Sequence, residues 1–134
     1  MIRILLFFLL AMVSVSCQQK ETDDPLQAYK YWAGSNPPEE IQILNGRYWE
    51  SAHWTKEYIM YLKISPTPEW WDAFVAMNQL TIDHAGYILP EDAPAWFDVR
   101  RDFVVYSRKG VFDQGSRYFL DPISGICYLY EVQL

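Results

Sequence analysis

The sequence predicts an α+β fold, a small single domain in which an antiparallel sheet packs with one main amphipathic helix. Two observations carry this prediction. Apolar residues recur at helical spacing over residues 68–80, whereas strand-forming residues dominate several other segments. The last three of these segments are separated by glycine-containing turns, which predicts a C-terminal β-meander. A helix packed with such a sheet belongs to the α+β class.

The first predicted element is a short helix over residues 25–33. Asp24 is a typical N-cap, and Pro25 suits the first helical position because its missing N–H costs nothing there. The Gly- and Pro-rich residues 34–38 end this helix. The side of the helix expected to pack carries Leu26, Tyr29 and Trp32.

Residues 38–64 are expected to lead from a further helical turn into the sheet. Pro38 opens one turn through Leu44, and Asn45-Gly46 closes it as a tight turn. Strands are predicted over residues 47–52 and 58–64. The second has apolar residues on both faces, which is typical of a central strand.

The main helix is predicted from Thr67 to about Leu80. Thr67 caps it, Pro68 takes the first position, and an acidic residue follows in the first turn, where the helix dipole favours it. Spacings of four and three residues along the helix predict a core stripe. The stripe is formed by Trp70, Phe74 and Met77.

The remainder of the chain predicts a long connection and then the meander. Residues 83–98 contain two prolines and no periodicity, so we expect an irregular segment pinned by Trp96-Phe97. Turn-forming residues separate the strand-like segments that follow. These predicted strands are residues 103–107, 116–120 and 126–132.

Residues 1–17 have the composition of an export signal. Arg3 precedes an apolar run of about 10 residues, which is too short for a bilayer that needs roughly 20. The stretch Ser14-Val15-Ser16-Cys17 resembles the lipobox of bacterial lipoproteins, with Ser14 where that family usually has Leu, Val or Ile. The resemblance implies cleavage of residues 1–16 and acylation of Cys17. The alternative is an ordinary secreted protein cut near Ser16, in which Cys17 is incidental.

The predicted anchor sets the expected location and domain organisation. Residues 17–24 form a polar stretch without apolar residues after the cysteine, so we expect a flexible tether, followed by a single globular domain over residues 25–134. The lysine and acids of the tether are similar to the short acidic signals that send some lipoproteins to the outer face of the outer membrane, and the expected location is the outer membrane of a Gram-negative bacterium. We expect a lipid-anchored envelope protein and leave open whether it faces the periplasm or the surface.

Charge and cysteine content exclude some classes of function. The net charge is −6, and it becomes −7 once residues 1–16, with their single basic residue, are removed. An acidic chain is a poor ligand for phosphates, so nucleic acid is not an expected partner. Cys127 is left without a partner in the chain and lies in an apolar segment, which indicates a buried, inert thiol.

The sequence assembles no recognisable catalytic, metal or cofactor motif. His53 and His84 stand apart, each without a second ligand at metal-binding spacing. Asp83-His84 is a candidate acid–imidazole pair, and an acidic domain supplies candidate carboxylate pairs by chance. We therefore expect a non-enzymatic protein, with a small hydrolase as the third hypothesis. The candidate acids are Glu50, Glu57, Asp72, Asp83, Glu91, Asp92 and Asp98.

Aromatic content is the unusual property of this chain, with 6 Trp and 10 Tyr. Such side chains serve cores, protein interfaces and sugar-stacking platforms. The first hypothesis is a domain that binds another protein, as an accessory subunit or an immunity-type inhibitor of a toxin. The alternative is a glycan-binding module. The aromatics placed beside turns or in irregular segments form the expected binding surface, which comprises Trp49, Trp54, Tyr58 and Trp96.

Overall fold

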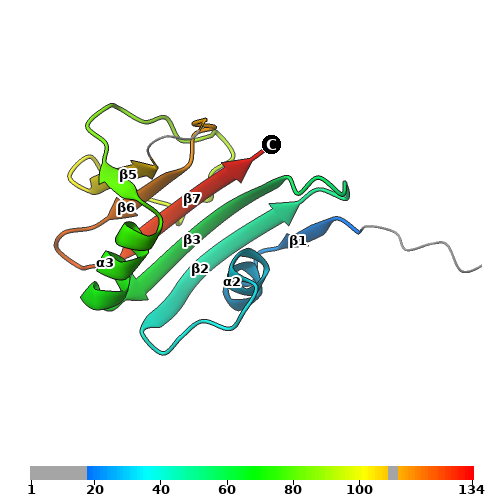
Figure 1. Cartoon of the computed structure of the whole chain (residues 1–134), viewed down its shortest axis with the longest axis horizontal. Helices are drawn as coiled ribbons and strands as arrows, with labels where there is room; N and C mark the ends of the chain where they lie inside the picture. The colour runs from blue at the N-terminus through cyan, green and yellow to red at the C-terminus, as the bar shows by residue number, and fades with distance from the viewer. Residues whose placement is uncertain (1–17, 109–111) are drawn as a thin grey trace, which may run out of the picture.

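The computed structural model describes residues 18–108 and 112–134, so Cys17 and the predicted signal peptide lie outside the described residues. It confirms the α+β class: a seven-stranded antiparallel sheet, in the order β1-β2-β3-β7-β6-β5-β4, carries two helices (Figure 1). The elements are β1 (Lys20–Thr22), α2 (Pro25–Ala33), β2 (Ile41–Glu50), β3 (Tyr58–Pro66), α3 (Pro68–Met77), β4 (Leu80–Ile82), β5 (Val104–Arg108), β6 (Arg117–Leu120) and β7 (Cys127–Gln133).

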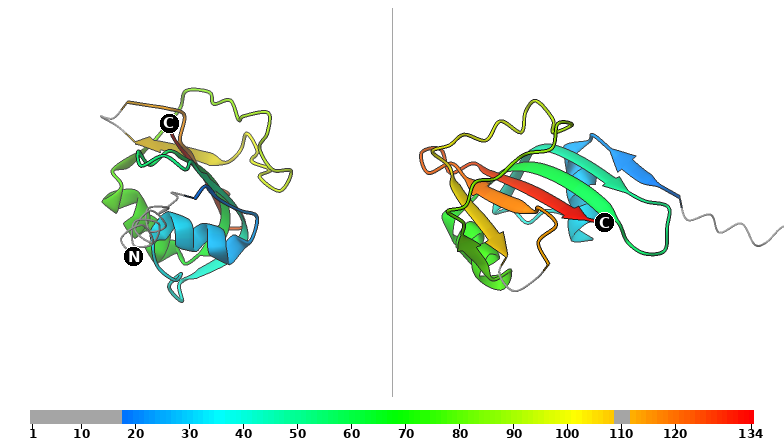
Figure 2. Two further views of the ribbon diagram at one scale, coloured as in Figure 1. Left: turned by 90° about the vertical axis from the view of Figure 1, so that its right-hand side faces the viewer. Right: turned by 90° about the horizontal axis from the view of Figure 1, so that it is seen from above.

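The sheet separates two apolar cores. Both helices pack on one face, which we call the helix face, and its core includes Tyr29, Leu62 and Trp71. Residues 83–103 cover the opposite, loop face, where Phe97 is among the buried residues. Figure 2 shows the helices and this connection on opposite sides of the sheet. A sheet buried on both faces explains why its strands are apolar on both sides.

Helix α2 forms where the capping signals predict it. The Asp24 carboxylate accepts a hydrogen bond from the Gln27 N–H at 2.7 Å, and Gly34 ends the helix with a left-handed φ of 74°. Ala28 and Tyr29 are buried against the sheet. The prediction that Leu26 lies on the packed side is wrong, because the packed face centres on Ala28 and Tyr29 and leaves Leu26 exposed.

Strand β2 forms where the sequence predicts the end of a helical turn that runs from Pro38 through Leu44 and a tight turn at Asn45-Gly46, so both of these predictions are wrong. It begins at Ile41, and a bulge shifts its register between Ile43 and Asn45. Gly46 lies within the strand, where an added Cβ would come within 2.9 Å of the Ala28 Cβ and 3.1 Å of Leu62 Cδ2. The glycine therefore permits close approach of α2 to the sheet rather than a turn.

The predicted flexible tether over residues 17–24 is wrong at Lys20–Thr22, which form β1. This strand pairs with β2, so that Lys20 lies opposite Glu50 and Thr22 opposite Tyr48. The Lys20 Nζ lies 3.3 Å from a Glu50 carboxylate oxygen. A polar segment needs no apolar surface to join a sheet edge, because backbone hydrogen bonds and an ion pair suffice to register it.

Helix α3 is shorter than predicted, since it ends at Met77. Thr67 caps it as expected and accepts from the Trp70 N–H at 3.2 Å. The packed face centres on Trp71, with Phe74 beside it. The prediction that Met77 is a core residue is wrong: its side chain is 83% exposed at the last helical position, facing away from the centre of the packed face.

The C-terminal half confirms the predicted connection and meander. Residues 83–103 contain no helix or strand, and β5, β6 and β7 follow as consecutive antiparallel neighbours. Phe97 is buried, as expected of a pinning residue. Cys127 is fully buried on the helix face, which confirms the predicted burial, and burial raises the pKa of its thiol.

Candidate functional site

A cleft of about 270 Å³ opens on the helix face, beside the C-terminal end of β7. We call it the helix-side cleft. Its walls come from the start of β3, the end of β5, the start of β6 and the segment that leads into β6. The lining side chains that matter for its chemistry are those of Tyr58, Arg108, Phe112, Asp113, Tyr118 and Glu131.

Glu131 is the most unusual residue of the cleft, since it is a carboxylate with 9% exposure. Strand alternation puts it on the helix face with Cys127 and Leu129, in an otherwise apolar row. The Trp32 indole N–H donates to both of its oxygens, at 2.9 and 3.1 Å, and the Tyr58 hydroxyl lies 3.2 Å from one of them. These donors stabilise a charge that burial alone would disfavour.

The tyrosines beside Glu131 remain protonated at neutral pH. Burial, together with the Glu131 charge, raises the pKa of Tyr58 to about 12. The same two causes raise the pKa of Tyr118 far above its ordinary value. Both hydroxyls therefore act as hydrogen-bond donors and not as bases, so the site can hold a ligand by hydrogen bonds and charge.

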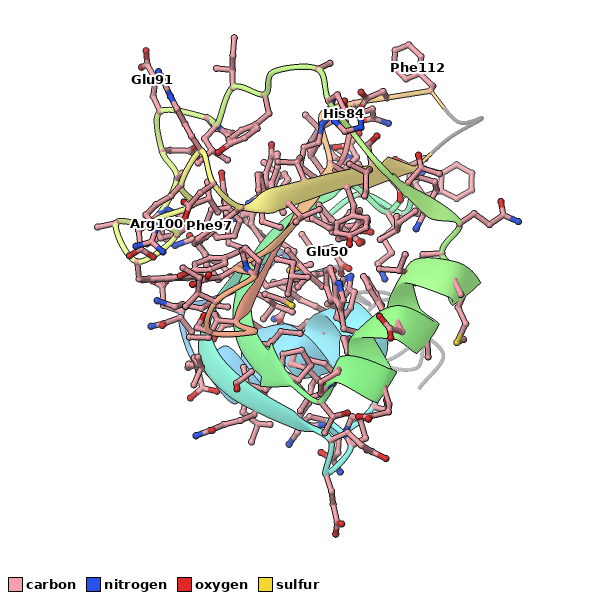
Figure 3. All side chains as sticks on the ribbon, turned by 90° about the vertical axis from the view of Figure 1, so that its left-hand side faces the viewer. Glu50, His84, Glu91, Phe97, Arg100 and Phe112 are labelled. Carbon is pink, nitrogen blue, oxygen red and sulfur yellow. The ribbon has the colours of Figure 1, made fainter. Side chains whose placement is uncertain are left out.

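A second carboxylate, Glu50, stands on the same face. The Tyr48 hydroxyl donates to it at 2.8 Å, and the Tyr48 ring stacks on Tyr58 with centroids 5.8 Å apart. Burial opposes its charge, but Tyr48, Lys20 and Lys56 outweigh burial and hold the pKa of Glu50 below its ordinary value. Figure 3 shows Glu50 on the helix side of the sheet and Phe112 projecting outward.

The predicted binding surface does not assemble into one surface. Tyr58 lies in the helix-side cleft, whereas Trp49 and Trp96 are half-buried on the loop side of the sheet. Trp54 is 93% exposed in the β2–β3 loop, away from both cores. Strand alternation separates Trp49 from Tyr58, because Trp49 and the neighbouring Tyr48 of β2 point to opposite faces.

Trp49 lines a second cleft of about 480 Å³, which we call the loop-side cleft. Tyr61, Arg47 and Asp92 also line it. The Arg47 side chain pairs with Asp23 at 2.7 Å and donates to the Asp92 carbonyl at 3.4 Å. The cleft therefore combines an aromatic wall with fixed polar groups.

The candidate Asp83-His84 pair has other partners in the structure. Asp83 lies 3.3 Å from the Arg117 guanidinium and accepts from the Ala85 N–H at 2.9 Å, while His84 is exposed at the edge of a third cleft. His53 is exposed in the β2–β3 loop. Over residues 18–108 and 112–134, no group of three or more His, Cys, Asp or Glu side chains is arranged to hold a metal ion.

The candidate acids are spread over the molecule. Glu50 belongs to the helix face described above, and Asp92 contributes to the loop-side cleft. Asp98 accepts from the Tyr128 hydroxyl at 3.0 Å and lies 3.5 Å from the Lys63 ammonium on the loop side. These three acids have separate local partners. The remaining candidates, besides Asp83, are the exposed or half-exposed Glu57, Asp72 and Glu91.

Sequence reasoning missed Glu131 and Arg108, which line the helix-side cleft, and Trp32, which donates to Glu131 from α2. One available signal points to Glu131: it is the sole acid in the last strand and shares the parity of Cys127 and Leu129. A charge at a core position of a strand requires buried partners. The identity of those partners depends on tertiary packing of α2, which no local pattern encodes.

Comparison of the chain with protein-family models, with curated proteins and with solved structures finds no match. Among the helices of the described part of the chain, none has the length and apolar character that a membrane span requires.

Proposed function

We propose that this chain is a lipid-anchored envelope protein whose folded domain binds another protein at the helix-side cleft. The observation that supports binding is Glu131, a buried carboxylate at a cleft that also presents aromatic side chains and Arg108. The anchor is proposed from the lipobox resemblance that ends at Cys17. Acylation by two or three chains would hold the domain firmly at a bilayer.

The size of the helix-side cleft favours a single partner side chain over a small-molecule ligand. Its volume of about 270 Å³ falls below the roughly 300–1,000 Å³ of typical ligand pockets. The cleft also presents residue types that are common at interface hot spots or in the buried centre of interfaces. These are Tyr58, Arg108 and Phe112, whose side chain is 89% exposed. A protein segment that inserts one side chain between them would match both the size and the composition.

The charge of the helix-side cleft indicates which kind of partner side chain it would bind. Two carboxylates, Glu131 and Asp113, and one cation, Arg108, line the helix-side cleft, so its charge is negative on balance, and the whole chain carries −6. A lysine or arginine of the partner would pair with Glu131 while its methylene stem packs on Tyr58 and Phe112. The negative charge of the domain would also speed its encounter with a basic surface. A basic partner at the envelope fits an accessory subunit or an immunity-type inhibitor.

The contacts of Glu131 favour binding over catalysis. Trp32 and Tyr58 already donate to its oxygens, so these contacts occupy the lone pairs that a general base would turn toward a substrate. The raised pKa of Tyr58 likewise keeps that hydroxyl from acting as a base at neutral pH. We therefore propose a non-enzymatic role.

The test is a pull-down of the full-length lipoprotein from detergent-solubilised membranes of its own cells, after chemical cross-linking. The parent should retain a basic partner, and Phe112→Ala should lose it. This variant should keep the stability of the parent, because the exposed Phe112 side chain contributes nothing to the core. Glu131→Gln should weaken capture while circular dichroism remains unchanged. Ile123→Ala, at an 84% exposed position in the β6–β7 turn, is the matched control and should behave as the parent.

Two results would contradict this function. One is recovery of the same proteins with the parent and with Phe112→Ala, because the helix-side cleft would then play no part in capture. The other is hydrolysis of an envelope substrate by the purified parent without any recovered partner, which would indicate an enzyme.

A second candidate function, glycan binding, is favoured by the loop-side cleft. Its volume of about 480 Å³ is within the range for ligand pockets, and it places Trp49 beside Arg47 and Asp92. A sugar would stack on the indole, accept hydrogen bonds from the Arg47 guanidinium and donate hydroxyl hydrogen bonds to the Asp92 carboxylate. Titration with envelope polysaccharides should change the tryptophan emission of the parent but not of Trp49→Phe. Equal responses of the two proteins would contradict glycan binding at this cleft.

A further inference from the structure

The β2–β3 loop, residues 51–57, presents a tryptophan to solvent. Trp54 is 93% exposed, although indole rings are among the costliest side chains to leave in water. Its neighbours His53 and Lys56 are also exposed. Tryptophan combines an apolar ring with a polar N–H, and for this reason it is enriched at protein interfaces and at the membrane–water interface.

The sheet register brings this loop next to the start of β1. Lys20 pairs with Glu50, the last residue of β2 before the loop. The Glu50 carboxylate lies 3.3 Å from the Lys20 ammonium and 3.9 Å from that of Lys56, on the far side of the loop. Figures 1 and 2 both show the β2–β3 loop at the end of the sheet where β1 begins.

The proposed lipid attachment site is close to β1 in the sequence. Cys17 precedes Lys20 by three positions, and three residues of chain reach at most about 11 Å. A bilayer that holds the acyl chains of Cys17 must therefore lie near the base of the loop. Pairing of β1 with β2 prevents a longer tether from moving the domain away.

We propose that residues 51–57 form a second membrane contact, in which the Trp54 indole enters the headgroup region of the bilayer that holds the lipid anchor. This inference rests on the proposed anchoring. Tryptophan favours the membrane–water interface because its ring is apolar and its N–H can remain hydrated. One indole is a weak anchor by itself, but acylation of Cys17 makes its contact intramolecular and raises its effective concentration.

The second contact would fix how the domain stands on the membrane. Tyr58 follows the loop and pairs with Gln133, so the helix-side cleft lies at the same end of the sheet as the loop. Ile123 lies in the β6–β7 turn, beyond the opposite end of β3, where Ile64 pairs with Cys127. A partner at the cleft would then be met close to the bilayer, and the β6–β7 turn would point away from it.

The test places a fluorophore at each end of the sheet in the full-length lipoprotein. Trp54→Cys and Ile123→Cys are labelled with a nitrobenzoxadiazole maleimide, which Cys127 resists because it is buried. Both proteins are incorporated into vesicles of phosphatidylethanolamine and phosphatidylglycerol that contain lipids spin-labelled near the headgroup. The label at position 54 should shift its emission to shorter wavelength and lose intensity, and the label at position 123 should do neither.

The native side chain provides a second readout without a label. Spin-labelled vesicles should quench a larger share of the tryptophan emission of the parent than of Trp54→Phe, which retains the other tryptophans. Added salt should not reverse the difference, because the contact is made by an indole and not by charge.

The outcomes separate the two proposals. Flotation of the lipoprotein with the vesicles, with equal quenching at positions 54 and 123, would overturn the second contact and leave the lipid anchor standing. Failure of the lipoprotein to float would overturn the anchor and, with it, the second contact. Flotation with quenching at position 54 alone supports both.

Discussion

The indole N–H of Trp32 in α2 donates to both carboxylate oxygens of Glu131 in β7, two residues separated by 99 positions in the chain. The contact joins the first helix to the last strand and satisfies a buried charge at the helix-side cleft. It is therefore both a structural tie and the support of the proposed binding residue.

The Trp32→Phe variant tests this tie. Phenylalanine fills most of the same space but removes the donor, and a hydrogen bond to a charged group contributes about 1.5–3 kcal/mol. Urea unfolding should show a loss of that size in the free energy of unfolding. Trp54→Phe is the control, since Trp54 is exposed, and should match the parent. Equal stability of all three proteins would contradict the account of Glu131.

The Gly46→Ala variant tests the close approach of α2 to the sheet. An added Cβ would meet the Ala28 Cβ at 2.9 Å and the Pro25 Cα at 3.0 Å, and overpacking typically costs about 1–3 kcal/mol. Gly86→Ala is the matched control, because nothing lies within 4 Å of its added Cβ. Thermal unfolding should show a lower Tm for Gly46→Ala only. A similar loss in both variants would indicate an effect of glycine replacement itself.

Acid sensitivity follows from carboxylates whose pKa is lowered by folding. Glu50 is held below its ordinary value of 4.5, and Asp98 and Asp113 are held below 3.8. Such groups stabilise the fold above their unfolded pKa, and this contribution disappears as the pH falls through the folded pKa. The free energy of unfolding should therefore decrease below about pH 4.5.

The contribution of Glu50 to this profile can be isolated. Glu50→Gln should lower stability at neutral pH and flatten the decrease between neutral pH and acid, as followed by urea unfolding at each pH. Glu91→Gln, at an exposed position, is the control and should retain the parental profile. A parental profile in Glu50→Gln would show that the Tyr48 and lysine contacts of Glu50 do not stabilise the folded state.

The Cys127 thiol should be unreactive in the folded protein. It is fully buried, and burial raises its pKa, so little thiolate is present or accessible at pH 8. Ellman's reagent should modify it only after urea is added. Rapid modification of the native protein would contradict the burial of this residue.

Elements encoded by local signals could be predicted from the sequence. Helices α2 and α3 begin where an N-cap is followed by proline, as at Asp24 and Thr67. The meander follows from alternating strands and glycine turns. The end of α3 was predicted three residues too late, because Gln79 takes a positive φ of 53° and the chain turns into β4 there.

Features that depend on distant contacts could not be predicted. Asn45-Gly46 resembles a turn locally, but Gly46 serves the packing of Ala28 on β2. Lys20–Thr22 has no apolar residue, and only the free edge of β2 makes it a strand. The candidate site has the same character: Tyr58 was among the predicted binding residues, whereas Glu131 and its donor Trp32 meet only in the folded chain.

Mass spectrometry of the N-terminal peptide from membrane-extracted protein decides whether Cys17 carries the lipid anchor. We expect a peptide that begins at Cys17 and carries the mass of a diacylglyceryl group, and we expect Cys17→Ser to leave the membrane fraction. An unmodified peptide that begins elsewhere, with the parent and Cys17→Ser distributed alike between membrane and soluble fractions, would contradict the proposed anchor.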